Sequence, residues 1–109
     1  MSTNVKTSSI KTVNPYNNEL VKEFEAMTPE QVNTIIDQAD EAFKTWRNTS
    51  FAERSKIMHK VASIMRERKE ELGKLATLEM GKLIAESIYE VELSADIFDY
   101  YAENAEKFL

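Results

Sequence analysis

The sequence contains no cysteine and only two glycines, two prolines and one histidine among its 109 residues. Without cysteine, the chain can form no disulfide, no thiolate metal site and no thiol nucleophile. So few glycines and prolines exclude long irregular loops and favour helix. The single histidine, His59, has no second ligand at metal-binding spacing, so we expect a surface or packed histidine and not a metal ligand.

The charge distribution excludes further classes of partner. The net charge is −5, and residues 83–109 alone carry seven acids and one lysine. The basic residues form no stripe, because signs alternate along Arg66–Glu71; binding to nucleic acid is therefore not expected. No apolar run approaches about 18 residues, so no membrane partner is expected and a cytoplasmic location is predicted.

The remaining composition, 42% hydrophobic and 30% charged, is typical of one small globular domain. Residues 1–8 are polar and expected to be disordered. Residues 10–24 predict a β-hairpin, in which two short alternating segments flank the turn-forming run Asn14–Asn18. A lone hairpin is marginal in water, so it should lie on helices or join a larger sheet.

Residues 29–47 predict a helix. Thr28 and Gln31 form a capping box around Pro29, which suits the first helical position. The apolar side chains that follow recur at three-and-four spacing, which predicts a face packed in the core; they are Val32, Ile35, Ile36, Ala39, Phe43 and Trp46.

Residues 51–81 predict a second helix, against which the other segments are expected to pack. A capping box, Ser50 and Glu53, precedes it, and Gly81 can end it in a left-handed conformation. Gly73 weakens the interior by about 1 kcal/mol relative to alanine, so a break is expected within 68–74.

Residues 83–109 predict a long helix with two apolar faces. Two runs at helical spacing lie on different sides: Ile84, Ile88, Val91, Ala95, Phe98, Ala102, Ala105 and Leu109 on one, and Tyr89, Leu93, Ile97, Tyr100 and Phe108 on the other. Unbroken, this helix spans about 40 Å, whereas a compact domain of this length has a radius of gyration of about 13 Å. We therefore expect the chain to be part of something larger, or to self-associate through this surface. The predicted fold class is mainly α, a short hairpin followed by three to four helices.

Several segments together resemble one known family. The turn Asn14–Glu19 is similar to the Asn-Pro-x-x-Gly-Glu turn near the start of aldehyde dehydrogenases. The other matching segments follow in that family's order: Ala39–Phe43 with Trp46, Ala52–Arg54, Arg66–Arg68, Leu78–Lys82 and Tyr100–Ala102. The branch most similar is that of the succinate-semialdehyde dehydrogenases, through residues 14–16, 51–54 and 99–106. The resemblance covers residues 10–109 but only the leading part of a full family member.

The resemblance implies a fold and an activity for a longer parent polypeptide. The fold is the leading part of an α/β, Rossmann-like cofactor domain, and the activity is NAD- or NADP-dependent oxidation of an aldehyde to an acid by a cysteine nucleophile. Since the cysteine and its partners belong to downstream sequence in the family, no catalytic and no cofactor-binding residue is assigned to this chain. The chain alone is expected to be inactive and to bind no cofactor. Its implied partner is the rest of the dehydrogenase polypeptide.

Two departures from the family pattern matter. Asn18 stands where glycine is usual, and asparagine tolerates a positive φ. Leu83 replaces the usual proline after Gly81-Lys82, so a softer break between the helices is expected.

The resemblance also implies a monovalent cation site, with backbone carbonyls of Thr12 and Val13 and the carboxylate of Glu79 as oxygen ligands. The alternative is that Glu79 simply lies near a helix end on the surface.

Two further functional hypotheses remain open. The chain could be a stand-alone helical interaction module that self-associates through residues 83–109, as the heptad-like spacing indicates. It could also carry an acid–base pair on Glu86 and Glu90 or on Asp96 and Asp99. The second hypothesis is weaker, because these carboxylates are spaced as on a solvated helix face.

Overall fold

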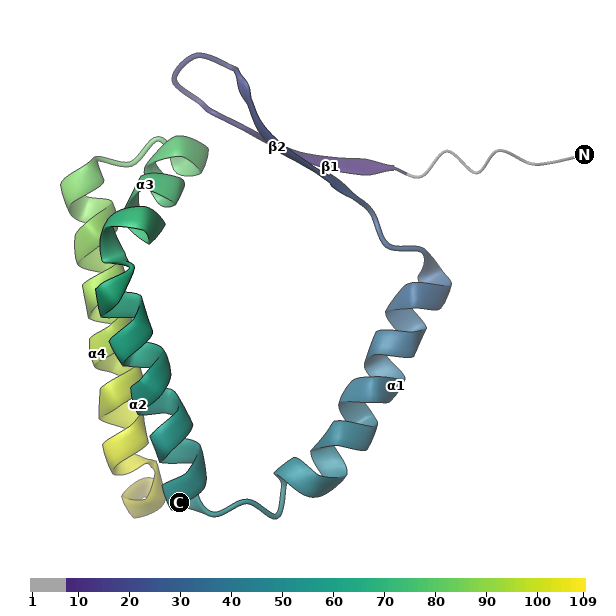
Figure 1. Cartoon of the computed structure of the whole chain (residues 1–109), viewed down its shortest axis with the longest axis vertical. Coiled ribbons are helices and arrows are strands. Elements are labelled where there is room, and N and C mark those ends of the chain that lie inside the picture. Colours follow the sequence, from purple (N-terminus) through teal and green to yellow (C-terminus); the bar gives the residue numbers. More distant parts are fainter. Residues whose placement is uncertain (1–7) are drawn as a thin grey trace, which may run out of the picture.

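A computed structural model describes residues 8–109 and contains a two-stranded hairpin followed by four helices. This confirms the expected mainly helical fold class (Figure 1). The elements are β1 (Ser9–Val13), β2 (Leu20–Glu25), α1 (Pro29–Trp46), α2 (Phe51–Glu67), α3 (Lys69–Met80) and α4 (Ile84–Phe108). The prediction of a disordered N-terminus falls, for residues 1–7, outside the described part of the chain.

The hairpin is antiparallel, and its turn depends on asparagine. Ser9 pairs with Glu25 and Thr12 with Lys22, after which the register shifts between Thr12 and Val13. Asn18 adopts φ 61°, as expected for a residue that stands in place of glycine. The turn is closed by a hydrogen bond of 2.9 Å from the Asn14 amide to the Glu19 carbonyl.

Both predicted capping boxes are present. The Thr28 hydroxyl accepts from the Gln31 amide at 3.1 Å, and the Gln31 side chain accepts from the Thr28 amide at 2.9 Å. At the start of α2, Ser50 and Glu53 make the same reciprocal pair at 3.1 and 2.7 Å. These caps satisfy amides that a helix start leaves without partners, so they fix where α1 and α2 begin.

The predicted long helix over 51–81 is broken into α2 and α3 at Arg68, which has φ −102° and ψ 13°. Gly73, which suggested a break, instead lies buried within α3. A Cβ atom at this position would lie 2.7 Å from Cγ1 of Ile88 on α4. Gly73 therefore permits α3 and α4 to approach closely, and the break lies at Arg68, at the start of the predicted range 68–74.

The reversal between α3 and α4 is sharp, which corrects the expectation of a softer break. Gly81 ends α3 with φ 72°, and Leu83 is extended with φ −61° and ψ 135°. Proline would fix nearly this φ, so leucine reproduces the turn without the ring. Pro15 of the hairpin turn also lies against Gly81, where a Cβ would be 3.0 Å from Cγ of Pro15. The hairpin thus touches the helical layer at this turn.

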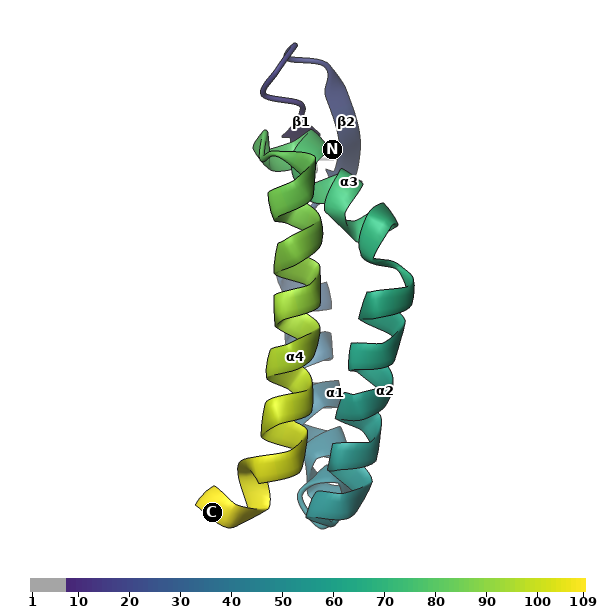
Figure 2. The same cartoon turned by 90° about the vertical axis from the view of Figure 1, so that its left-hand side faces the viewer.

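The packed part of the chain is the layer formed by α2, α3 and α4, seen side by side in Figure 2. α4 is the central element of this layer, because it packs along both α2 and α3. Ala62 on α2 and Ala95 on α4 are fully buried, and Ser87 is 1% exposed. The Ser87 hydroxyl lies 3.1 Å from that of Thr77 on α3, so it has a hydrogen-bonding partner. Small side chains therefore allow the helices to approach closely.

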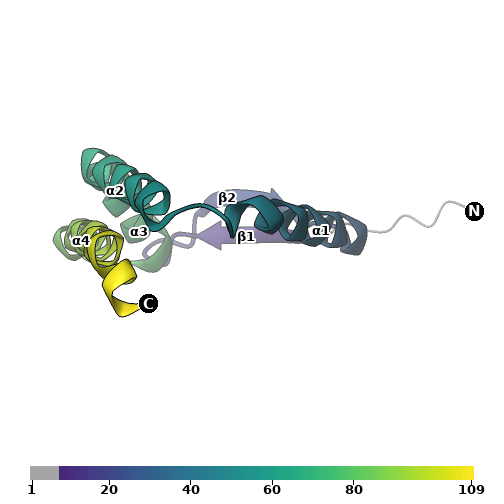
Figure 3. The same cartoon turned by 90° about the horizontal axis from the view of Figure 1, so that it is seen from below.

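α1 stands apart from this layer, which corrects the prediction that its apolar face is packed. No residue of α1 is buried, and α1 makes no extensive contact with another described element. Figures 1 and 3 show that α1, which is joined to the start of α2, extends away from α2 and α4. The connection to α2 is short and ordered, since the Thr49 hydroxyl donates to the Trp46 carbonyl at 2.7 Å. The expectation that the other segments pack on residues 51–81 is therefore right for α4 and wrong for α1.

Candidate functional site

Ion pairs join α4 to the other two helices of the layer. Arg66 on α2 donates to Asp96 and Asp99 on α4, each at 2.7 Å. Lys69 on α3 donates to Glu92 at 2.7 Å. Lys82, between α3 and α4, pairs with Glu90. The acids that make residues 83–109 strongly negative thus serve, in part, to bind α4 to its basic neighbours.

Asp99 is the most connected of these acids. Its carboxylate accepts from Nδ1 of His59 at 2.6 Å and from Arg66 at 2.7 Å. The hydrogen bond from His59, followed by that from Arg66, holds the pKa of the Asp99 carboxyl below its ordinary value. Asp99 is 27% exposed, whereas His59 and Arg66 are 40% and 41% exposed. The cluster is therefore a partly screened link between α2 and α4.

The substitution Asp99→Asn should lower the free energy of unfolding at neutral pH and make it less dependent on pH in the acidic range. A carboxyl whose pKa is lowered by folding stabilises the protein above its unfolded pKa of about 3.9, and this contribution is lost as the pH falls through the folded value. Urea unfolding should be measured from neutral pH to pH about 3. The free energies of unfolding of the wild type and of Asp99→Asn should become more similar as the pH falls. The matched control is Glu103→Gln, which removes an exposed carboxyl on the same helix. If the difference in free energy of unfolding between the wild type and Asp99→Asn stayed constant with pH, the lowered pKa of Asp99 would not contribute to stability.

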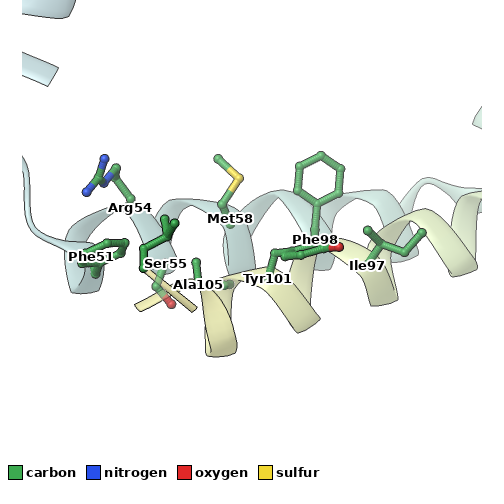
Figure 4. A pocket seen from close by; sticks show the side chains of 10 residues that line it. Phe51, Arg54, Ser55, Met58, Ile97, Phe98, Tyr101 and Ala105 are labelled. Carbon is green, nitrogen blue, oxygen red and sulfur yellow. The ribbon is translucent and has the colours of Figure 1, made fainter. Parts of the chain in front are cut away.

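An apolar groove lies between the start of α2 and the end of α4. Its volume is about 410 Å³, and Figure 4 shows Met58 of α2 and Phe98 of α4 pointing to the same side. Arg54 lies at the groove and is stacked 4.9 Å from the ring centre of Phe51. The lining residues are Phe51, Arg54, Ser55, Met58, Ile97, Phe98, Tyr101, Ala102, Ala105 and Leu109.

Two apolar helix faces of the described chain are left open to solvent. The outer face of α4 is one, and its residues are between 42% and 62% exposed: Tyr89, Leu93, Ile97, Tyr100 and Phe108. The other, here called the α1 stripe, is between 41% and 59% exposed: Val32, Ile35, Ile36, Phe43 and Trp46. The prediction that α4 remains unbroken and carries more apolar surface than the chain covers is confirmed. Contiguous apolar faces of this kind mark interaction surfaces.

The residues predicted to bind a cation lie on two elements that contact each other. Thr12 and Val13 end β1, and Glu79 lies half-buried near the end of α3. Within residues 8–109, no group of three or more acidic or histidine side chains is placed to hold a metal ion. The predicted site uses two backbone carbonyls and one carboxylate, so it is of a different kind and stays a prediction.

Three of the four acids considered for an acid–base pair, all except Glu86, form ion pairs between or beside the helices. Glu90 pairs with Lys82, while Asp96 and Asp99 both pair with Arg66. The prediction that Asp96 and Asp99 belong to a solvated helix face is therefore wrong, because both link α4 to α2.

No helix of residues 8–109 combines the length and the hydrophobicity that a membrane span requires.

Comparison with known proteins decides the family. The model of the aldehyde dehydrogenase family matches residues 2–109. The chain belongs to this family. The resemblance found in the turn Asn14–Glu19 and the later segments is thereby confirmed.

The most informative relatives are NADP⁺-linked dehydrogenases. Succinate-semialdehyde dehydrogenase [NADP(+)] of Deinococcus radiodurans is 44% identical over 98 residues, which are 90% of this chain and 20% of the relative. A crystal structure of succinic semialdehyde dehydrogenase from Streptococcus pyogenes with NADP⁺ matches with a TM-score of 0.85 and 38% identity, over 91% of this chain and 22% of that one. An NADP-dependent glyceraldehyde-3-phosphate dehydrogenase from Bacillus halodurans matches with a TM-score of 0.86 and 31% identity, over 90% of this chain and 21% of that one.

The chain represents only a small part of an aldehyde dehydrogenase. It spans about a fifth of the length of the relatives it matches. The backbone agrees about equally well with enzymes named for different aldehydes, so the fold of this segment does not distinguish their substrates. The exposed α1 stripe and outer face of α4 are therefore features of a segment that, in the matched proteins, accompanies a much longer chain.

Proposed function

We propose that the chain is the leading segment of an NADP⁺-dependent succinate-semialdehyde dehydrogenase and that it acts as a scaffold and not as a catalyst. The observation that carries the proposal is its 44% identity with the Deinococcus radiodurans enzyme. The parent would oxidise the aldehyde group of succinate semialdehyde to a carboxylate and reduce the cofactor. The nucleophile and the cofactor site would be supplied by the rest of the polypeptide, because this chain contains no cysteine.

The exposed faces support the scaffolding role. The α2–α3–α4 layer is held together by ion pairs and close helix contacts within the chain. The α1 stripe and the outer face of α4 are uncovered, so they would pack against the rest of the parent. The cation site at Thr12, Val13 and Glu79 is proposed as part of the same scaffold, where it would tie the hairpin to the end of α3.

A segment exchange tests this function. The chain replaces the aligned segment of the Deinococcus radiodurans enzyme, and NADPH formation from succinate semialdehyde is measured. We expect at least about a tenth of the host's activity, which corresponds to a loss of no more than about 1.4 kcal/mol. The isolated chain should give none.

The Bacillus halodurans relative is the matched control host, because it has the same fold but only 31% identity. We expect the exchange to retain a larger share of activity in the succinate-semialdehyde host. Two inactive chimeras would refute the scaffolding role. Better retention in the Bacillus halodurans host would refute the assignment to the succinate-semialdehyde branch.

A second candidate function is a helical interaction module that self-associates. The outer face of α4 favours it, because Tyr89 and Phe108 are 62% and 61% exposed in an unbroken helix. Such a module would need no dehydrogenase partner. Failure of both chimeras together with a defined oligomer of the isolated chain would favour this second function.

A further inference from the structure

We propose that the α2–α4 groove receives a short apolar segment of the parent polypeptide that carries a single carboxylate, and that this carboxylate binds the guanidinium of Arg54. For the source of the segment the inference rests on the proposed function, in which this chain is about a fifth of a longer polypeptide. It adds a binding surface and the chemistry of its occupant.

The first argument is the composition of the groove. Within the described chain, Arg54 of α2 is the only charged residue that lines it. Figure 4 shows Arg54 and Phe51 at one end of the groove and Ile97 at the other. The residues that α4 contributes are all uncharged: Ile97, Phe98, Tyr101, Ala102, Ala105 and Leu109. A complementary occupant is therefore apolar along most of its length and negative at one end.

The second argument is that Arg54 has no acidic partner among residues 8–109. The other basic side chains that are partly buried each pair with an acid, and the pairs are His59–Asp99, Lys69–Glu92 and Lys82–Glu90. Arg54 is partly buried as well, yet no carboxylate of the described chain lies within ion-pair distance of it. Because burying a charge without a partner is unfavourable, a carboxylate from outside the described chain would stabilise Arg54.

The third argument is the position and orientation of Arg54. It lies at the start of α2, where the helix dipole disfavours a positive charge, so this charge does not serve to stabilise α2 itself. Its guanidinium is stacked 4.9 Å from the centre of the Phe51 ring. Stacking occupies the face of the guanidinium and leaves its N–H edge able to donate two parallel hydrogen bonds to one carboxylate.

The acids of α4 limit the occupant to one carboxylate. Glu103 and Glu106 do not line the groove, but they line a neighbouring hollow together with His59. A segment with several acids, such as α1 with four, would be repelled by them, whereas one carboxylate held directly on Arg54 forms a short charge-assisted pair. On α2 the groove extends only from Phe51 to Met58, so it fits a short segment and not a long helix.

The first test uses the 109-residue chain, with octanoate and octanol as probes. Octanoate has an apolar chain that ends in a carboxylate, and octanol has the same chain without the charge. Binding is followed by the methyl NMR signal of Met58, which lines the groove. Octanoate should bind about tenfold more tightly than octanol, as expected for one charge-assisted contact.

The substitution Arg54→Met should remove this preference for octanoate. The matched control is Lys56→Met, an exposed basic residue of α2 that does not line the groove, and it should keep the preference. Circular dichroism should show the wild-type helix content in both variants. Equal binding of the two probes, no octanoate binding at millimolar concentration, or a preference that Arg54→Met retains would each overturn the carboxylate contact.

The second test identifies the source of the occupant in the chimera with the Deinococcus radiodurans enzyme. There the parent polypeptide fills the groove, so octanoate should no longer shift the Met58 signal. A shift as large as that in the isolated chain would mean that the groove stays open to small carboxylates, and it would overturn the assignment to a polypeptide segment.

The substitution Arg54→Glu should act differently in the two settings. In the chimera it places two carboxylates together, and the midpoint of thermal inactivation should fall by about 4 °C or more. In the isolated chain it places an acid at the start of α2, where the helix dipole favours it, so the midpoint of thermal unfolding should not fall. An unchanged midpoint in the chimera would overturn the proposed contact.

The two proposals fail in different ways. Two inactive chimeras would overturn the proposed function, and with it the source of the segment. The octanoate preference is measured on the isolated chain without any dehydrogenase activity, so its absence would overturn the contact at Arg54 alone.

Discussion

Ala95→Glu is expected to abolish cooperative unfolding of this chain. Ala95 lies on α4 and is fully buried. A glutamate there must either remain charged in a dry contact or push α4 away from its neighbours, and the ion pairs from Arg66 and Lys69 would then separate as well. The expected loss is about 4 kcal/mol or more of the free energy of unfolding, against a total of about 5 to 15 kcal/mol for a domain.

Thermal unfolding followed by far-ultraviolet circular dichroism measures this effect. The matched control is Tyr89→Glu, which places the same side chain at a 62% exposed position of the same helix. The control should change the free energy of unfolding by no more than about 0.5 kcal/mol. If Ala95→Glu unfolded as cooperatively and at the same temperature as the control, α4 would not be the central element of the layer.

Local signals in the sequence were enough to predict most of the elements. The capping residues Thr28 and Ser50 and the end at Gly81 act through hydrogen bonds and φ values within a few residues. The positive φ of Asn18 follows from the same local chemistry. The two faces of residues 83–109 were also predictable, because helical spacing alone places Ala95 and Leu93 on different sides.

The pairing of the helices was harder to predict, because it depends on contacts between distant residues. Gly73 indicated a weak point within a helix, but its role is to admit Ile88 of α4. The missed signal was charge. Residues 51–82 carry eight basic and five acidic side chains, opposite the acidic stretch 83–109. Those opposite charges on consecutive helices indicate the ion pairs of Arg66 and Lys69.

The position of α1 could not be predicted from its own sequence. The α1 stripe has the spacing of a core face, and the pattern indicates that such a face needs cover without indicating what covers it. Within this chain it is exposed, since the connection Arg47–Ser50 leads α1 away from the layer. The absence of a catalytic cysteine was evident at once, whereas the sequence of α1 does not indicate which surface covers it.

The double substitution Ile36→Lys and Phe43→Lys should therefore leave the isolated chain unchanged but impair the chimera. In the isolated chain these side chains are 59% and 54% exposed, and the helix content should not change. In the chimera with the Deinococcus radiodurans enzyme, the proposed function buries both positions against the rest of the polypeptide. Two lysines there would leave charges without partners in an apolar contact, at about 3 kcal/mol or more in total.

We expect the soluble NADPH-forming activity of that chimera to fall about 100-fold or more, the equivalent of about 2.7 kcal/mol. Thr34→Lys with Glu41→Lys is the matched control, since it adds lysines to the opposite face of α1. This control should keep the activity of the parent chimera. Equal activity in all three chimeras would mean that the α1 stripe stays in solvent in the full enzyme. The scaffold would then consist of the α2–α3–α4 layer and the hairpin alone, and the conspicuous spacing of Val32, Ile36 and Phe43 would have to serve a partner outside the dehydrogenase fold.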